Sequence, residues 1–84
     1  MNLPHQDQIK EYISNQIPCD YLEVEGDGAH FFATIVSESF TGKRLIQRHQ
    51  MVYAALGDRM KDEIHALSMT TLTPEEYKAK NNNG

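Results

Sequence analysis

Apolar positions in the first half of the chain follow two spacings, which predict one helix and two strands. Isoleucines at positions 9, 13 and 17 have the spacing of a one-sided helix, and we expect that helix to run from Pro4 to Ile17. Pro18 ends it, because proline lacks an amide hydrogen and disfavours helical geometry in the preceding residue. Residues 20–25 then alternate between apolar and polar, and residues 30–37 are rich in aromatic and branched side chains. A hairpin follows, because the glycines of Gly26-Asp27-Gly28 allow the positive φ angles of a tight turn.

The middle of the chain predicts an anchored loop and the main core helix. Residues 38–43 read as a loop that buries the Phe40 ring. A helix from Arg44 to Leu56 follows, with Gly57 as its C-terminal cap. We expect its core face to consist of the residues that recur at steps of three and four, namely Leu45, Ile46, His49, Val52, Tyr53 and Leu56. Residues 58–63 predict a short helix or a single turn.

The last part of the chain combines a strand with a strong helix-start signal. Within the segment from Ile64 to Tyr77, His65 opens a strand-like run that extends to Leu72. Thr73, Pro74 and Glu76 then provide an N-cap, a proline at the first helical position and a glutamate that can reach back to the cap. We expect a final helix from Thr73 to about Lys80, and a disordered tail at 81–84 because nothing there can be buried.

These elements predict an α+β fold in the order α-β-β-α-(short α)-β-α, as a single domain over residues 1–80. The two hairpin strands and the third strand form a three-stranded sheet packed on helices, which we expect on one face. The third strand follows a helical crossover, whose length permits a parallel arrangement.

Composition narrows the function classes. The chain has 84 residues, 39% of them hydrophobic and 24% charged, which is typical of one small globular domain. A net charge of −4 argues against a large nonspecific footprint for nucleic acid. One cysteine excludes an intrachain disulfide, and neither a leader pattern nor a long apolar span appears. We therefore expect a cytoplasmic protein without a membrane anchor.

No pattern in the sequence indicates catalysis. The chain contains no GxSxG, HExxH, phosphate-binding GK[ST] or GxGxxG motif. Glu75 and Glu76 are adjacent carboxylates, but at a helix start the helix dipole favours negative charge without any catalytic role. We therefore expect a protein that is not an enzyme.

Histidines supply the candidate ligands. On residue type alone, His30 and His65 read as surface strand histidines more readily than as metal ligands. His49 is predicted to be a hydrogen-bonded structural histidine on the core helix, and Cys19 a buried or idle thiol. Two histidines, or one with Asp27, would leave a tetrahedral site incomplete. A partner protein could complete it, since imidazole replaces thiolate at some iron-sulfur centres.

Three segments together resemble the BolA-like protein family over nearly the whole chain. They are Phe40-Thr41-Gly42-Lys43 running into Gln47-Arg48-His49-Gln50-Met51-Val52-Tyr53, then Ile64-His65-Ala66-Leu67, then Leu72-Thr73-Pro74-Glu75-Glu76-Tyr77. The Gly-Asp-Gly-Ala-His-Phe hairpin resembles the bacterial IbaG (YrbA) branch, whereas the segments around Phe40 and Arg48 resemble the BolA2-type branch. The resemblance implies a type II KH-like fold.

The resemblance also implies a function in iron-sulfur metabolism. Proteins of this family pair with monothiol glutaredoxins of the CGFS type and share a [2Fe-2S] cluster ligated on the other side by the glutaredoxin cysteine and glutathione. The family's histidine ligand falls on His65. Its hairpin cysteine falls on Asp27, a harder donor than iron-sulfur clusters prefer, so we favour His30 as the second ligand over Asp27.

A nucleic-acid-binding regulator of transcription, active in stress responses, is the alternative. A KH-like fold and the cations Lys43, Arg44 and Arg48 favour it, but the chain lacks the G-x-x-G loop of KH sites. We prefer to interpret these cations as a solvated helix start. The sequence leaves open whether the protein delivers clusters or senses iron, and whether it forms a homodimer.

Overall fold

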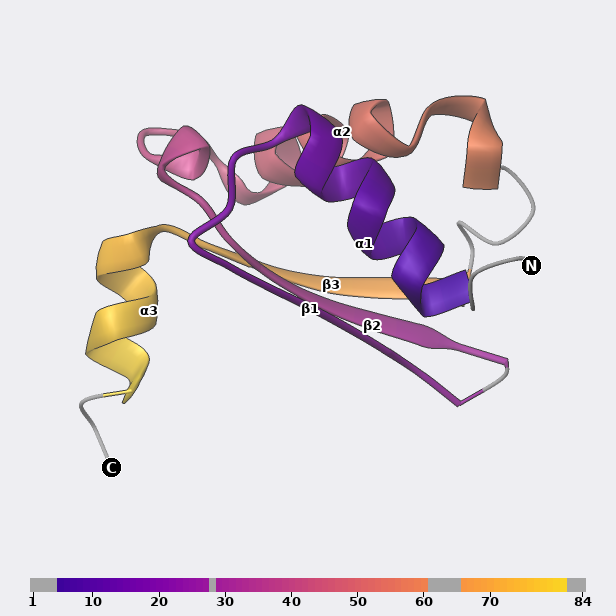
Figure 1. The fold of residues 1–84 in the computed structure, drawn as a ribbon. Helices are drawn as coiled ribbons and strands as arrows, with labels where there is room; N and C mark the ends of the chain where they lie inside the picture. Colours follow the sequence, from indigo (N-terminus) through magenta and orange to yellow (C-terminus); the bar gives the residue numbers. More distant parts are fainter. Residues whose placement is uncertain (1–4, 28, 61–65, 82–84) are drawn as a thin grey trace.

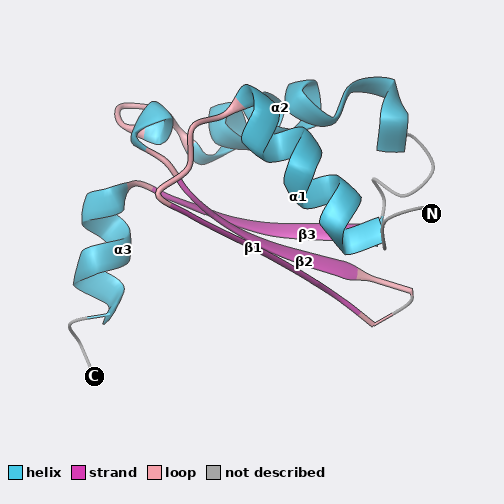
Figure 2. Cartoon of the chain, viewed as in Figure 1, coloured by secondary structure: helices cyan, strands magenta, loops and turns pink. Residues whose placement is uncertain are grey.

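A computed structural model describes residues 5–27, 29–60 and 66–81 and contains the predicted elements in the predicted order (Figures 1 and 2). Within these residues, no helix has the length and apolar character needed to cross a membrane. The elements are α1 (His5–Gln16), β1 (Tyr21–Gly26), β2 (Phe31–Val36), the 3-10 helix η1 (Glu38–Phe40), α2 (Leu45–Leu56), the 3-10 helix η2 (Gly57–Met60), β3 (Leu67–Leu72) and α3 (Pro74–Asn81).

The three strands form one sheet in which β2 is central. β1 pairs with β2 in antiparallel register, with Val24 opposite Ala33. β3 pairs with the other edge of β2 in parallel, with Leu67 opposite Phe31. The prediction of a parallel third strand is confirmed, since η1, α2 and η2 supply the crossover that a parallel pair requires. The chain therefore enters β2 and β3 at the same end of the sheet.

One face of the sheet packs under α1 and α2 (Figure 1). Alternate strand residues point into this layer, where they meet the predicted isoleucines of α1. Phe40 is fully buried in the same core, as predicted for the loop after β2. The strand side chains that belong to this core cluster are Val24, Phe31, Ala33, Ile35 and Leu67.

The opposite face of the sheet is more open, and α3 contacts it at one end. Phe32 points to this face and is 49% exposed. At the other end of the same face the ring of Tyr21 stacks on that of Tyr77 from α3, with centroids 5.3 Å apart. The expectation of helices on one face thus describes α1 and α2, whereas α3 lies at the end of the sheet (Figure 2).

The predicted core face of α2 was partly wrong. Val52 and Leu56 are buried as expected, together with Ala55. Leu45, Ile46 and Tyr53 are instead 60%, 65% and 40% exposed. The buried residues of α2 all lie in its second half, whereas its first half contacts β3 through Arg48. Apolar spacing could not show where along the helix burial begins.

Two glycine predictions had different outcomes. Gly57 adopts a positive φ of 59° and its amide donates to the Tyr53 carbonyl, which confirms it as the C-terminal cap of α2. Gly26 has no positive φ and is the last residue of β1, so the expected left-handed turn is wrong at that position. A Cβ there would lie 3.0 Å from the Phe31 ring, which makes close packing the reason for glycine.

The remaining boundaries shift by a few residues. His30 precedes β2 instead of opening it. α3 includes Asn81, one residue beyond the predicted helix, because its cap and its contacts with the sheet hold the preceding turns. Ile64, His65 and residues 82–84 of the expected tail lie outside the described residues.

Candidate ligand hairpin and arginine clamp

The hairpin between β1 and β2 is organised by the Asp27 carboxylate. Its Oδ1 accepts hydrogen bonds from the backbone amides of Ala29 (2.9 Å) and His30 (2.7 Å). The Asp27 amide also donates to the His30 carbonyl at 3.1 Å. Aspartate favours such turns because its short side chain reaches the amides two and three residues on. Asp27 therefore fixes the backbone that carries His30.

The hairpin brings the two predicted loop ligands together at the surface. Asp27 Oδ2 lies 3.9 Å from His30 Nδ1, and the two side chains are 62% and 65% exposed. The bonds from the Ala29 and His30 amides lower the pKa of the Asp27 carboxyl, with a smaller contribution from the His30 charge. Asp27 thus stays ionised to a lower pH than an ordinary aspartate.

This donor set fits part of a shared iron-sulfur site. His30 offers an exposed imidazole, the nitrogen donor that can replace thiolate at such clusters. Asp27 is a harder oxygen donor, and its Oδ1 already accepts two amides. Among the described residues, no three histidine, cysteine or acidic side chains gather closely enough to hold a metal ion. The hairpin fits one terminal ligand, His30, better than a complete site.

His65, the first of the predicted ligands, lies outside the described residues. The structure does place the start of β3, at Leu67, beside Phe31 at the start of β2. His30 directly precedes Phe31, so the hairpin and the entry to β3 share one end of the sheet.

His49 and Cys19 lie outside the hairpin, and each has a more buried environment than Asp27 and His30. His49 is half-buried on α2, and its Nε2 is enclosed without a hydrogen-bond partner among the described residues. The expectation of a hydrogen-bonded histidine is therefore wrong at this atom. The Cys19 thiol donates to the Ile17 carbonyl at 3.1 Å. Burial, followed by the charge of Asp20, raises its pKa, so it stays protonated at neutral pH.

A second polar cluster, the arginine clamp, joins α2, β3 and α3 through Arg48. Its Nε donates to the Lys43 carbonyl (3.0 Å), and its Nη1 donates to the Thr71 carbonyl (3.1 Å). Both terminal nitrogens also bind Glu76, with Nη1 2.8 Å from Oε1 and Nη2 3.3 Å from Oε2. The side chain is only 11% exposed, and its guanidinium carbon lies 6.0 Å from the centre of the Phe40 ring.

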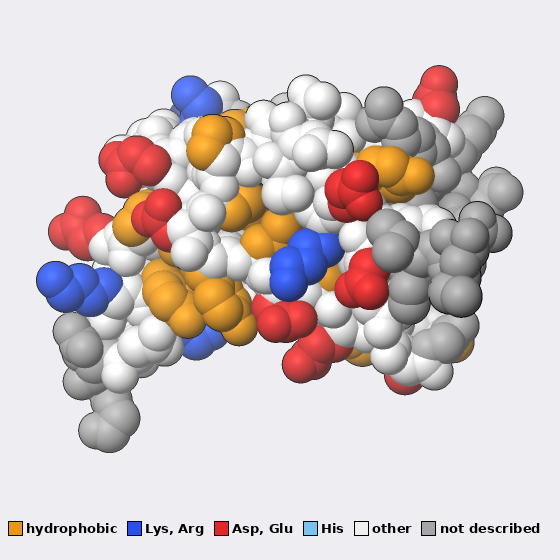
Figure 3. Space-filling model, in the orientation of Figure 1, with side chains coloured by type: hydrophobic (Ala, Val, Ile, Leu, Met, Phe, Trp, Pro, Cys, Tyr) orange, Lys and Arg blue, Asp and Glu red, His pale blue; other side chains and the backbone are white. Residues whose placement is uncertain are grey.

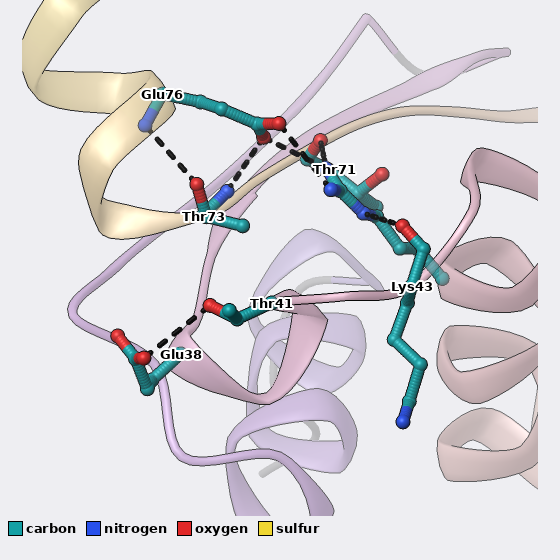
Figure 4. Close-up of polar contacts among 7 residues, drawn as sticks. Glu38, Thr41, Lys43, Thr71, Thr73 and Glu76 are labelled. Atoms are coloured by element: carbon teal, nitrogen blue, oxygen red, sulfur yellow. Dashed lines mark hydrogen bonds and ion pairs between the residues drawn. The ribbon is translucent and has the colours of Figure 1, made fainter.

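The clamp includes the predicted helix cap (Figure 4). The Thr73 amide donates to Glu76 Oε1 at 2.8 Å, and the Glu76 amide donates to Thr73 Oγ1 at 3.1 Å, which confirms the capping box. The hydrogen bond from Arg48, followed by that from the Thr73 amide, lowers the pKa of Glu76 to about 2. Glu76 is therefore a carboxylate at any physiological pH.

The predicted basic cluster does not act as one group in this structure. Lys43 and Arg44 are exposed, whereas Arg48 is largely buried and paired with Glu76. The Lys43 ammonium extends away from Glu76 (Figure 4). On the face shown in Figure 3, the lysine and arginine side chains are separated and interspersed with acidic ones.

The pairing of Arg48 with Glu76 was missed from the sequence. The two residues are 28 positions apart, and each had a sufficient local explanation, as a helix cation and as a capping glutamate. A possible signal was the position of Arg48 one turn after the start of α2, beside the half-buried His49. Spacing alone could not indicate which acid it meets.

Comparison with known proteins identifies the family. The sequence model described as BolA-like protein matches residues 9–76. The chain is a BolA-like protein. It is 42% identical over 78 residues to Protein BOLA2 of Arabidopsis thaliana, which covers 87% of this chain and 83% of that one. It is 35% identical to the DNA-binding transcriptional regulator BolA of Haemophilus influenzae, over 90% and 84% of the two chains.

Solved structures agree with the fold of this BolA-like chain. A Bol-like protein from Babesia bovis matches with a TM-score of 0.82 and 32% identity, over 95% of this chain and 96% of that one. The BolA domain of SufE1 from Arabidopsis thaliana matches with a TM-score of 0.77 and 33% identity, over 90% and 99%. The predicted α+β fold and the resemblance are both confirmed.

Proposed function

We propose that this BolA-like protein is a non-enzymatic partner of a monothiol CGFS glutaredoxin and shares a glutathione-dependent [2Fe-2S] cluster with it. Its role would be cluster trafficking or assembly, or iron homeostasis. The observation that carries the proposal is the exposed His30 imidazole on the Asp27-capped hairpin, at the end of the sheet where β3 begins. The matches to Protein BOLA2 and to the BolA domain of SufE1 support it.

The hairpin offers one ligand and leaves the others to a partner. In this proposal His30 and His65 donate imidazole nitrogens, while the glutaredoxin cysteine and the glutathione thiol complete the set. Asp27 holds the His30 backbone through its Oδ1 and does not ligate. A rigid hairpin presents the imidazole with little loss of backbone entropy on binding.

Reconstitution with a CGFS glutaredoxin, glutathione, ferrous iron and sulfide tests this proposal. The expected product is a heterodimer on size exclusion, with visible absorption and circular dichroism that change in His65→Ala and His30→Ala. Asp27→Asn should retain both the heterodimer and its spectra, because an amide oxygen can still accept hydrogen bonds from the backbone amides of the turn. His49→Gln controls for loss of an imidazole elsewhere. The proposal is wrong if the wild-type chain forms no heterodimer.

DNA binding is the second candidate, because the Haemophilus influenzae relative is named as a DNA-binding regulator. The net charge of −4 and the internal pairing of Arg48 weigh against it. Titration of a labelled duplex at several salt concentrations tests it, since each phosphate contact adds about 0.9 to the salt slope. If Lys43→Ala and Arg44→Ala bound the duplex as tightly as wild type, the surface around Lys43 and Arg44 would be excluded as a DNA-binding site.

A further inference from the structure

One aromatic contact and one ion pair attach the described residues of α3 to the rest of the molecule. α3 has eight residues and none of them is buried. Helices shorter than about 12 residues are marginal in water on their own, so α3 depends on its contacts to remain helical. Those contacts are the Tyr77 ring on Tyr21 and the Glu76 carboxylate on Arg48. Loss of the Glu76 contact should therefore shift α3 towards a released form, held only by the Tyr77 stack, while the core stays folded.

The guanidinium of Arg48 is held in place by contacts that do not involve α3. The Lys43 and Thr71 carbonyls accept from its Nε and Nη1, and the Phe40 ring lies against it. Release of α3 would leave these contacts intact. Glu76 accepts hydrogen bonds from Arg48 Nη1, Arg48 Nη2 and the Thr73 amide. These three donors would lose that shared acceptor on release of α3.

We propose that the Arg48 guanidinium and the Thr73 amide form an oxyanion site, which Glu76 occupies while α3 is docked and a phosphate group occupies when α3 is released. Three N–H groups converge on the Glu76 carboxylate, and a phosphate offers more acceptor oxygens for the same donors. α3 is then a strap whose docking controls access. This inference is independent of the proposed glutaredoxin partnership.

Removal of the internal carboxylate is the first test. Inorganic phosphate is titrated into the full chain at pH 7.5 and constant ionic strength, with the Thr73 backbone amide resonance followed by NMR, because every variant retains this donor. Glu76→Ala should bind phosphate at least about tenfold more tightly than wild type, because Glu76 no longer competes. Glu75→Ala is the matched control, since this exposed neighbour has no side-chain partner within the described part of the chain, and it should stay within about twofold.

Reciprocal linkage provides a second test that needs no variant to fold. If phosphate binds only the released form, phosphate must raise hydrogen exchange at the α3 amides of wild type, relative to chloride at the same ionic strength. The β2 amides should not change. A parallel titration with dimethyl phosphate distinguishes a free or monoester phosphate from the diester of a nucleic acid. Binding of either supports the site.

Three results would overturn the proposal. Equal gains in phosphate affinity in Glu76→Ala and Glu75→Ala would show that the gain comes from the change in net charge and not from the removal of Glu76 from the site. If the Arg48→Lys, Glu76→Ala double variant bound phosphate as tightly as Glu76→Ala alone, the phosphate would not bind at the Arg48 guanidinium. Exchange at α3 that is insensitive to phosphate would show that the carboxylate is not displaced.

Discussion

Replacement of Arg48 by methionine removes the guanidinium and retains an unbranched apolar stem of similar helix propensity. The change deletes the hydrogen bonds to the Lys43 and Thr71 carbonyls and the ion pair with Glu76. The Thr71 carbonyl is part-buried, so the loss of its partner there should cost more than the loss of the exposed bond to Lys43.

These contacts give a destabilisation of about 2 kcal/mol. The Thr71 bond contributes about 1 to 1.5 kcal/mol because a charged donor serves a part-buried acceptor. The Glu76 pair adds only about 0.5 kcal/mol, since that carboxylate is 47% exposed and solvent screens it. The exposed Lys43 bond adds a similar small amount. With an unfolding entropy of about 2.1 cal/mol/K per residue, 2 kcal/mol lowers the Tm of 84 residues by about 11 °C.

Urea denaturation followed by far-ultraviolet circular dichroism measures this change in the free energy of unfolding. Arg44→Met is the matched control on the same helix, and it should change stability by less than about 0.5 kcal/mol because Arg44 is exposed. Equal losses in the two variants, or a loss below about 0.5 kcal/mol for Arg48→Met, would refute the role given to the clamp. A changed m-value would point to an altered denatured state instead.

Three further outcomes are expected. The pKa of Glu76 in the folded protein, about 2, lies below its ordinary value. The stability that ionised Glu76 adds to the fold is therefore complete above about pH 5 and disappears as the pH falls towards 2. The difference in Tm between Glu76→Gln and wild type should shrink over that range. Phe40→Ala should lower the free energy of unfolding by about 3–5 kcal/mol in urea melts, since the ring is fully buried, and a loss below about 1 kcal/mol would contradict the core assignment. Asp27→Ala should speed hydrogen exchange at the His30 amide, measured by NMR, whereas Asp27→Asn should preserve its protection; equal exchange in both variants would disprove the turn cap.

The elements of this fold were predictable because their signals are local. The isoleucine spacing of α1, the Thr73–Glu76 cap and the alternation of β1 depend on residues close in sequence, and the structure retains each of them. The family motifs added the fold type, which periodicity alone had left at the level of an α+β sheet. The candidate ligand His30 also came from the sequence, through its place in the hairpin.

What the sequence could not predict depends on contacts between distant segments. Leu45 and Ile46 match a helical core pattern, yet they are exposed, because the buried residues of α2 lie only in its second half. The turn role of Asp27 depends on the backbone path of the hairpin, which brings the amides of two later residues to one oxygen.

The clearest division between sequence and structure is at Arg48 and Glu76. The sequence by itself determined that a cation lies on the second helix and that a capping glutamate starts the last one. Only the tertiary structure decided that they pair, because strand pairing between β2 and β3 brings the end of β3 beside the start of α2. A cation that the sequence offered to an outside ligand is thereby bound by the protein's own carboxylate.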